Sequence, residues 1–192
     1  MPAVLQNVWL KIKKYKLPLL GAVLLLTLCL ILAGNAYRRD HYQVQAVWQE
    51  ENATLSVQET IRLTNRAGES LDHLCLRLYP NAFAEERSVP VPDNELSIAY
   101  PEGFTSGGVS NLSVQVNGKN APFMLEGAQR TVLRVQLPFS LRPQGGAEVT
   151  LRYDAALSRN RLRTGVLTKD VRLCNVLATL CIFQDGAFRT DD

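Results

Sequence analysis

Residues 55–64 read Leu-Ser-Val-Gln-Glu-Thr-Ile-Arg-Leu-Thr, and their side chains alternate between apolar and polar with a period of two. Successive side chains of a β-strand point to opposite faces, so this pattern predicts a strand with one buried face and one solvated face. Glu59 alone interrupts the pattern, because it places a carboxyl group on the apolar face. The rest of the fold is predicted by finding the same period elsewhere in the chain.

Alternation recurs along most of the chain after residue 40. It is found over residues 42–48, 74–79, 112–116, 132–137 and 147–153. Short connections join the stretches over residues 42–48, 55–64 and 74–79, which predicts antiparallel pairing between neighbours. Asn117-Gly118 is typical of a two-residue hairpin turn, and we expect Phe123 and Leu125 on its return strand. Many short strands separated by close turns indicate an all-β fold, either an antiparallel β-sandwich or an open barrel.

Two prolines are expected to end strands, since proline cannot donate a backbone hydrogen bond to a sheet. Pro80 follows a strand whose leucines 74, 76 and 78 point inward, so that Cys75 and Arg77 point outward. Pro138 is expected to close the strand over residues 132–137. Residues 81–108 hold further prolines and lack a regular period, which is typical of a functional or mobile loop. The spacing of Leu96, Ile98 and Tyr100 could also place one short strand inside that loop.

The only long apolar stretch lies near the N-terminus, at residues 17–36, and it contains no charged residue. About 20 apolar residues in a helix cross the hydrocarbon core of a bilayer. Lysines predominate before this stretch, which predicts a basic cytoplasmic tail over residues 1–16, one transmembrane anchor and an extracytoplasmic domain. The alternative is a cleaved signal peptide, although its apolar core would be unusually long. The predicted partner of this segment is the lipid bilayer.

Charge is unevenly distributed between the two ends of the chain. The first 39 residues carry 6 of the 21 basic residues and none of the 18 acidic ones, which leaves 15 basic against 18 acidic residues beyond them. The predicted domain over residues 40–192 is therefore mildly acidic, although the whole chain has a formal charge of +3. A nucleic-acid-binding surface needs a basic patch, so this class of partner is excluded.

No catalytic, cofactor-binding or metal-binding residue is predicted. The two histidines, His41 and His73, are far too few and too scattered for a zinc site, and no His-Glu-x-x-His sequence occurs. Acidic residues crowd the long loop at Glu85, Glu86, Asp93 and Glu95, but their spacing matches no calcium loop, and a solvated loop is expected. Arg159, Arg161 and Arg163 are similarly expected to be solvated rather than bound to an anionic partner.

Four cysteines are present, at positions 29, 75, 174 and 181. The spacing between them is not that of a zinc or redox motif. Cys174 and Cys181 could form a disulfide if a hairpin brings them together outside the cytoplasm. The other interpretation is that all four are small buried apolar residues.

One combination of motifs resembles the aminopeptidase-N-like zinc metallopeptidases, and in particular their membrane-anchored bacterial branch. It consists of Tyr42-x-Val44, a strand closed by Thr64-Asn65, and the segment Leu78-Tyr79-Pro80-Asn81-Ala82-Phe83. The resemblance covers about residues 40–192 and implies the non-catalytic N-terminal domain of that family, an antiparallel β-sandwich or saddle, incomplete at its C-terminal end. It weakens at residues 174–178, where Cys-Asn-Val-Leu-Ala stands in place of the family's Gly-Asn-Trp-Tyr-Pro.

The resemblance implies a function without catalysis in this chain. No position matches the family's zinc or catalytic motifs, so the enzyme class stays uncertain, and a catalytic metallopeptidase domain on a separate chain is the implied partner. The alternative function is a free-standing, membrane-tethered binding module that acts through the loop over residues 81–108. An enzyme of unrecognised type would need a cluster of ionisable groups in a pocket, and the sequence offers no such pair.

Overall fold

The computed structural model describes residues 24–29 and 39–190. The chain divides into two units, residues 1–39 and 40–192. In the first unit, residues 24–29 are helical, and the remainder of the predicted anchor over residues 17–36 lies outside the described residues. Within the described parts of the chain, no helix has the length and apolarity that a membrane crossing requires.

The second unit is mostly β, with antiparallel sheets, as the alternating pattern predicted. The larger sheet has the strand order β1-β2-β8-β4-β5. Its strands are β1 (His41–Gln49), β2 (Thr54–Thr64), β8 (Gly146–Ala156), β4 (Gly108–Val116) and β5 (Lys119–Asn120). A short 3₁₀ helix, η1 (Glu50–Asn52), joins β1 to β2, and β1 pairs along its whole length with residues 54–62 of β2.

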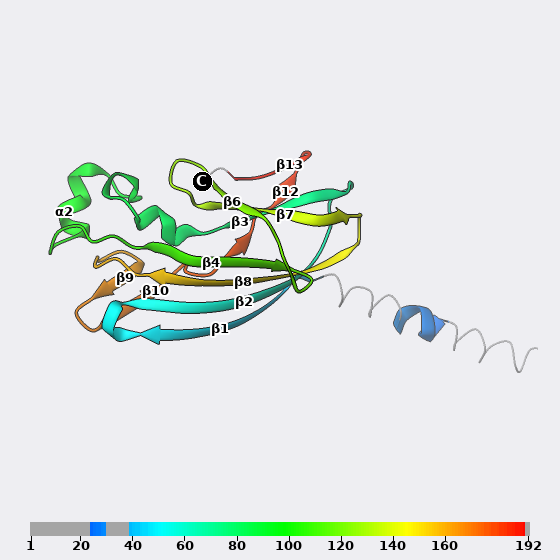
Figure 1. The fold of residues 1–192 in the computed structure, drawn as a ribbon, viewed down its shortest axis with the longest axis horizontal. Helices are drawn as coiled ribbons and strands as arrows, with labels where there is room; N and C mark the ends of the chain where they lie inside the picture. Colours follow the sequence, from blue (N-terminus) through cyan, green and yellow to red (C-terminus); the bar gives the residue numbers. More distant parts are fainter. Residues whose placement is uncertain (1–23, 30–38, 191–192) are drawn as a thin grey trace, which may run out of the picture. The chain divides into compact units, whose positions relative to one another are not determined.

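The second sheet has the order β11-β3-β7-β6 and forms the other layer of the sandwich (Figure 1). Its strands are β11 (Thr179–Leu180), β3 (Leu71–Arg77), β7 (Val132–Leu141) and β6 (Phe123–Glu126). Two small hairpins complete the strands: β9 (Thr164–Leu167) with β10 (Asp170–Leu173), and β12 (Phe183–Gln184) with β13 (Ala187–Phe188).

The main core lies between the inner faces of the two sheets. The larger sheet contributes side chains such as Ile61, Val149 and Leu151, and the smaller sheet contributes Leu76 and Leu133, all with no exposed surface. The alternation of β2 and β8 in the sequence is reproduced as alternation of burial. Removal of this apolar surface from water is the main force that holds the layers together.

The connections differ from the prediction in two places. β2 and β3 are consecutive and closely linked, yet they belong to different sheets, because β2 pairs with β8 and β3 pairs with β7. Asn117 and Gly118 form the expected tight turn with positive φ angles, but the return strand is the short β5. Phe123 and Leu125 belong instead to β6 in the smaller sheet. A short loop can cross between layers as readily as it can form a hairpin, so loop length did not determine pairing.

Pro138 does not end its strand, contrary to the prediction. β7 continues to Leu141, and the pairing register shifts between Leu71 and His73 so that Leu71 lies opposite Leu141. The irregular part of β7 that contains Pro138 lies within this shift. A proline is tolerated there because its position lies outside the regular ladder and needs no donor.

Residues 79–99 contain short helices, and the short strand that the spacing of residues 96–100 allowed is not formed. The helices are η2 (Tyr79–Phe83), η3 (Glu86–Ser88), η4 (Asp93–Glu95) and α2 (Leu96–Ala99). A second core of five buried residues holds this region together: Ala82, Phe83, Val89, Ala99 and Tyr100. The spacing of Leu96, Ile98 and Tyr100 suits a strand, but Leu96 packs against this small core while Ile98 is 64% exposed.

Candidate functional site

β1 presents an open edge of the larger sheet. It pairs only with β2 among the described strands, and every one of its residues is exposed except the half-buried Trp48. Its side chains at Tyr42 and Val44 lie on the same face as the core of β2, yet they are 39% and 36% exposed. An uncovered strand with apolar side chains on its inner face is suited to a further polypeptide.

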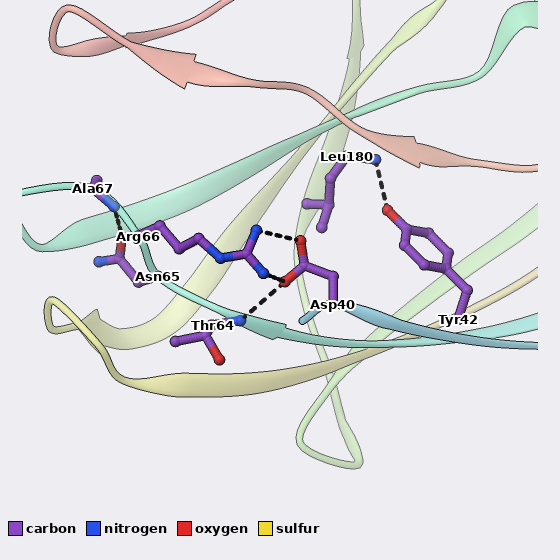
Figure 2. Close-up of polar contacts among 7 residues, drawn as sticks. All are labelled: Asp40, Tyr42, Thr64, Asn65, Arg66, Ala67 and Leu180. Atoms are coloured by element: carbon purple, nitrogen blue, oxygen red, sulfur yellow. Dashed lines mark hydrogen bonds and ion pairs between the residues drawn. The ribbon is translucent and has the colours of Figure 1, made fainter. Parts of the chain in front are cut away.

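The C-terminal segment meets this open edge through a backbone contact. The amide of Leu180, in β11, donates a hydrogen bond of 3.2 Å to the hydroxyl of Tyr42 (Figure 2). β11 also pairs with β3, so it lies at the edge of one sheet and contacts the edge of the other. We call the region where Tyr42, Glu59, Tyr153 and residues 176–180 meet the seam.

The start of β1 is held by an ion pair. The guanidinium of Arg66 donates to both carboxylate oxygens of Asp40 at 3.2 Å, and the amide of Thr64 donates to Oδ1 of Asp40 at 3.3 Å (Figure 2). Two parallel bonds between a guanidinium and a carboxylate fix orientation as well as distance. Asp40 therefore fixes the position at which the chain enters the β-domain.

The loop from β2 to β3 is organised by a buried asparagine. Asn65 accepts a hydrogen bond from the amide of Ala67 at 2.8 Å (Figure 2), and its side-chain amide donates to the carbonyl oxygens of Glu69 and Leu141. The residue that closes β2 in the resemblance motif thus has a structural role. It fixes the loop that carries the chain from one sheet to the other.

A pocket of about 320 Å³ lies beside this loop. Its walls combine polar groups of the Asp40–Arg66 region with apolar side chains of both sheets and of the C-terminal segment. The apolar residues are Leu63, Ala67, Leu71, Leu74, Leu180, Ile182, Phe183 and Phe188. A pocket with an apolar wall and a charged rim can accept an apolar side chain from another polypeptide. It contains neither a nucleophile paired with a base nor a set of metal ligands.

Glu59 is the most unusual residue of the seam, because it is a fully buried acid on the inner face of β2. Its Oε2 accepts a hydrogen bond of 3.0 Å from the amide of Ala178 and lies 3.3 Å from the hydroxyl of Tyr153. That hydroxyl also accepts from the Ala178 amide at 3.2 Å and lies 3.2 Å from the carbonyl oxygen of Val176. Among the described residues, Oε1 of Glu59 is one of two buried side-chain atoms with no hydrogen-bond partner.

Burial is the largest cause of the pKa shifts of Glu59 and Tyr153. It raises the pKa of Glu59 from 4.5 to about 7, although the bonds from Ala178 and Tyr153 oppose the shift. Burial, and then the nearby Glu59, raise the pKa of Tyr153 as well. A raised pKa in a cleft is typical of a general acid or base, but Glu59 has no exposed surface. We therefore assign it to the attachment of residues 176–178 to the larger sheet.

Glu59 was detectable in the sequence only as an interruption of the apolar face of β2. The prediction did not identify its partners, because they come from residues 94 and 119 positions away. An acid at an inward position indicates either a strand boundary or a buried polar contact, and only the tertiary structure distinguishes the two.

A larger pocket of about 550 Å³ lies at the opposite end of β1. Its lining includes Trp48, the β1–β2 turn, Glu102, Arg159 and Lys169. Arg159 forms a 3.8 Å ion pair with Glu102, and both side chains are more than half exposed. Charges of both signs on exposed side chains give this pocket no preference for one class of ligand.

The predicted solvated groups are solvated. Glu85, Glu86, Asp93 and Glu95 are all exposed, and Glu85 pairs with Arg87 at 2.7 Å. In the part of the chain that the structure describes, no three acidic, histidine or cysteine residues are grouped to hold a metal ion. The arginines at 159, 161 and 163 are exposed, while Asn160 between them is buried and bonds to the carbonyl oxygens of Ser158 and Thr164.

The cysteines and the outer face of β3 differ from the prediction. Cys174 is exposed, so the described cysteines are not all buried, and Cys181 lies against Cys75 rather than Cys174. Cys75 and Arg77 point outward as expected, yet both are buried. The chain returns over this face near its C-terminus, where Phe188 packs edge-on against the ring of His73 at 5.4 Å. No local pattern in β3 could predict this cover.

The segment Leu78–Phe83, which carries the family resemblance, forms a buried corner. Pro80, Asn81, Ala82 and Phe83 are all buried in η2. The side chain of Asn81 accepts from the amide of Val109 at 2.8 Å and donates to the carbonyl oxygen of Arg130 at 2.7 Å. Asn81 therefore connects β4 of the larger sheet to the loop before β7 of the smaller sheet.

Comparisons with known proteins give a result only at the level of solved structures. No family model matches the chain, and no curated protein matches it. An M1 zinc metallopeptidase from Deinococcus radiodurans is 19% identical, with a TM-score of 0.41 over 68% of this chain and 23% of that structure. A two-domain M1 zinc metallopeptidase bound to L-arginine is 20% identical, with a TM-score of 0.38 over 61% of this chain and 20% of that structure. The chain spans about a fifth of these structures, and similarity at this level assigns neither a family nor an activity.

Proposed function

We propose that this protein is the membrane-anchored, non-catalytic N-terminal domain of an aminopeptidase-N-like zinc metallopeptidase. In this proposal the β-domain supports a catalytic domain that lies outside the 192 residues. The observation that carries the proposal is the Leu78–Phe83 corner. Its residues match a motif of that family, four of them are buried, and the side chain of Asn81 bonds to the backbone at Val109 and at Arg130.

The open edge of β1 is the proposed contact surface for the catalytic domain. Tyr42 and Val44 belong to the resemblance motif, lie on the inner face of the sheet and are 39% and 36% exposed. Covering these side chains would remove apolar surface from water at about 25 cal/mol per Å². Such a contact is consistent with the family, in which the N-terminal domain packs on the catalytic one and shapes the substrate entrance.

The membrane anchor is part of the same proposal. It is supported by the uncharged apolar sequence over residues 17–36 and by the basic residues before it. The proposed topology places the N-terminus in the cytoplasm and residues 40–192 outside it.

Two experiments on the full chain test the anchor and its topology. The protein is expected to remain with membranes after a carbonate wash, and release into the soluble fraction would contradict an uncut anchor. A membrane-impermeant amine reagent applied to intact cells should label Lys119 and Lys169, which are exposed in the β-domain. Labelling of these lysines only after the cells are opened would contradict the extracytoplasmic placement.

The proposed partner is tested by coexpression. The DNA downstream of this coding region is read for a frame that encodes His-Glu-x-x-His, and that product is produced together with this chain. We expect copurification, and hydrolysis of an aminoacyl reporter by the complex but not by this chain alone. If no such frame exists and an unrelated gene follows, a free-standing membrane-tethered binding module becomes the better interpretation.

A matched pair of variants tests the contact surface. Val44→Lys places a charge on the inner face of β1, while Val47→Lys places it on the opposite face, where Val47 is 64% exposed. We expect Val44→Lys to weaken copurification with the catalytic chain at least tenfold and Val47→Lys to leave it unchanged. Equal effects of the two variants would exclude the inner face of β1 as the contact surface.

A further inference from the structure

Cys75 and Cys181 occupy opposite positions on two antiparallel strands. Thr179 pairs with Arg77 and Leu180 pairs with Leu76, so the same register continued by one residue places Cys181 opposite Cys75. The amide of Cys181 donates a hydrogen bond of 2.9 Å to the carbonyl oxygen of Cys75, which confirms this register. Directly opposed residues of an antiparallel pair have their side chains on the same face of the sheet.

This type of pair has suitable geometry for a disulfide. Opposed residues in the hydrogen-bonded positions of an antiparallel ladder have Cα atoms about 5.5 Å apart. Disulfides join Cα atoms that are most often about 5.5–6 Å apart, so the Cα separation of such a pair lies within the range that a disulfide spans. In the structure the two residues are separate free cysteines.

The surroundings of the two thiols also favour pairing with each other. Cys75 and Cys181 are 3% and 8% exposed, and together with Val132 they form a separate small core on the outer face of β3. Phe188 packs against this core. Cys174 is exposed. Its amide donates to the carbonyl oxygen of Arg163, and its carbonyl oxygen accepts from the hydroxyl of Thr164, so it is held beside the start of β9. Each of the two buried thiols therefore has the other as its nearest cysteine on this face.

We propose that Cys75 and Cys181 form a disulfide that fastens the C-terminal segment, residues 179–188, to β3. The proposal rests on the proposed placement of the β-domain outside the cytoplasm, because cytoplasmic thiols are kept reduced. The bond links β3 to a segment that is otherwise held in the second sheet by the short strand β11. It therefore prevents the outer face of β3, with Cys75 and Arg77, from becoming exposed.

The oxidation proceeds by thiol–disulfide exchange with a small-molecule or protein disulfide. The thiolate of one cysteine attacks the disulfide and releases one thiol, and the second cysteine then attacks the mixed disulfide and releases the other. Two protein thiols become one S–S bond, and the oxidant gains the two electrons and two protons as two thiols. Burial raises the pKa of both cysteines, so the exchange proceeds faster while the C-terminal segment is undocked.

The test uses the full chain, purified in detergent with all thiols reduced. The chain is unfolded, refolded in a mixture of reduced and oxidised glutathione, alkylated in denaturant, digested and analysed by mass spectrometry. We expect one linked pair of peptides, containing Cys75 and Cys181, with Cys29 and Cys174 alkylated. The oxidised chain should also melt roughly 5–10 °C higher than the same chain after reduction.

Three variants make the assignment specific. Cys174→Ser should keep the linked peptides, whereas Cys75→Ser and Cys181→Ala should each lose them and lose the effect of reductant on melting. The proposed disulfide is refuted if both Cys75 and Cys181 are found alkylated after refolding of the wild-type chain, or if Cys174 replaces either of them in the linked peptides. Both of these outcomes are read from wild-type protein and do not require the variants to fold.

A second sample separates this proposal from the proposed topology. Cells that express the full chain are quenched in acid, and the thiols are alkylated before purification. A disulfide that forms in the glutathione mixture and is also present in cells supports both proposals. A disulfide that forms in the mixture while both thiols are reduced in cells supports the pairing and contradicts the extracytoplasmic placement.

Discussion

β1 and β2 are neighbours in one sheet with similar sequence patterns, yet their environments differ. Both alternate apolar and polar residues, and all of β1 pairs residue by residue with β2. β2 has alternating burial, with Leu55, Val57, Glu59, Ile61 and Leu63 buried, while β1 is exposed on both faces except at Trp48. An alternating sequence shows which face can be buried, and the position of the second layer decides whether it is buried.

The largest expected difference between the two strands is the response of stability to pH. Because Glu59 has a pKa of about 7 in the folded chain and 4.5 as an ordinary carboxyl group, folding takes up a proton between these values. Stability is then fully present below pH 4.5, falls as the pH rises to 7 and is lower by about 3 kcal/mol above it. Glu59→Gln should remove this dependence in urea unfolding measured from pH 4 to pH 9.

The control for this effect is Glu50→Gln, since Glu50 is an exposed acid in the turn after β1. It should keep the pH dependence of the wild-type chain. A Glu59→Gln chain whose stability still fell between pH 4.5 and pH 7 would show that other groups cause the dependence.

A second comparison truncates one valine in each strand. Val57, on β2, is 4% exposed, and Val44, on the same face of β1, is 36% exposed. Val57→Ala should cost about 2 kcal/mol of unfolding free energy, because two buried methyl groups and their contacts are lost. Val44→Ala should change it by less than about 0.5 kcal/mol. Equal costs in urea unfolding of this chain alone would mean that the inner face of β1 is already covered.

The third comparison concerns two tyrosine hydroxyls that hold the C-terminal segment. Tyr153 OH is buried and bonds to Ala178 and Glu59, while Tyr42 OH accepts from Leu180 at a more exposed position. Tyr153→Phe should cost about 1–2 kcal/mol, since it leaves buried groups without a partner. Tyr42→Phe should cost less than about 1 kcal/mol.

Hydrogen exchange provides a readout that is specific to each hydroxyl. Tyr153→Phe should speed exchange of the Ala178 amide, and Tyr42→Phe should speed exchange of the Leu180 amide. If neither amide changes in its variant, the seam is held by side-chain packing and not by these hydroxyls.

The smallest expected effect is at the start of β1. Asp40→Asn removes the ion pair with Arg66, whose side chain is 53% exposed, so the cost should be about 0.5 kcal/mol and should shrink in high salt. The matched control is Arg62→Gln, which removes the exposed ion pair between Arg62 on β2 and Glu148 on β8 and should cost no more. A cost for Asp40→Asn that is independent of salt would assign the effect to the hydrogen bond from Thr64 instead of the ion pair.

The prediction of strands succeeded where burial follows from local pattern. The alternation of residues 55–64 and 147–153 became β2 and β8, and Asn117-Gly118 became a turn because its positive φ angles suit those residues. It failed where the outcome depended on distant partners. β3 leaves the sheet of β2, and the exposed face predicted for Cys75 and Arg77 is covered by residues more than 100 positions away.

The sequence by itself determined the all-β class, because a period of two in side-chain polarity can be satisfied only by an extended chain with one buried face. It also predicted that the acidic loop and the arginines at 159–163 would be solvated, since exposed charges of these types need no partner. The tertiary structure alone decided the sheet of each strand, the burial of Glu59 and the meeting of Cys75 with Cys181. These features depend on residues brought together from distant parts of the chain, and the free energy of such contacts is not encoded in any local pattern.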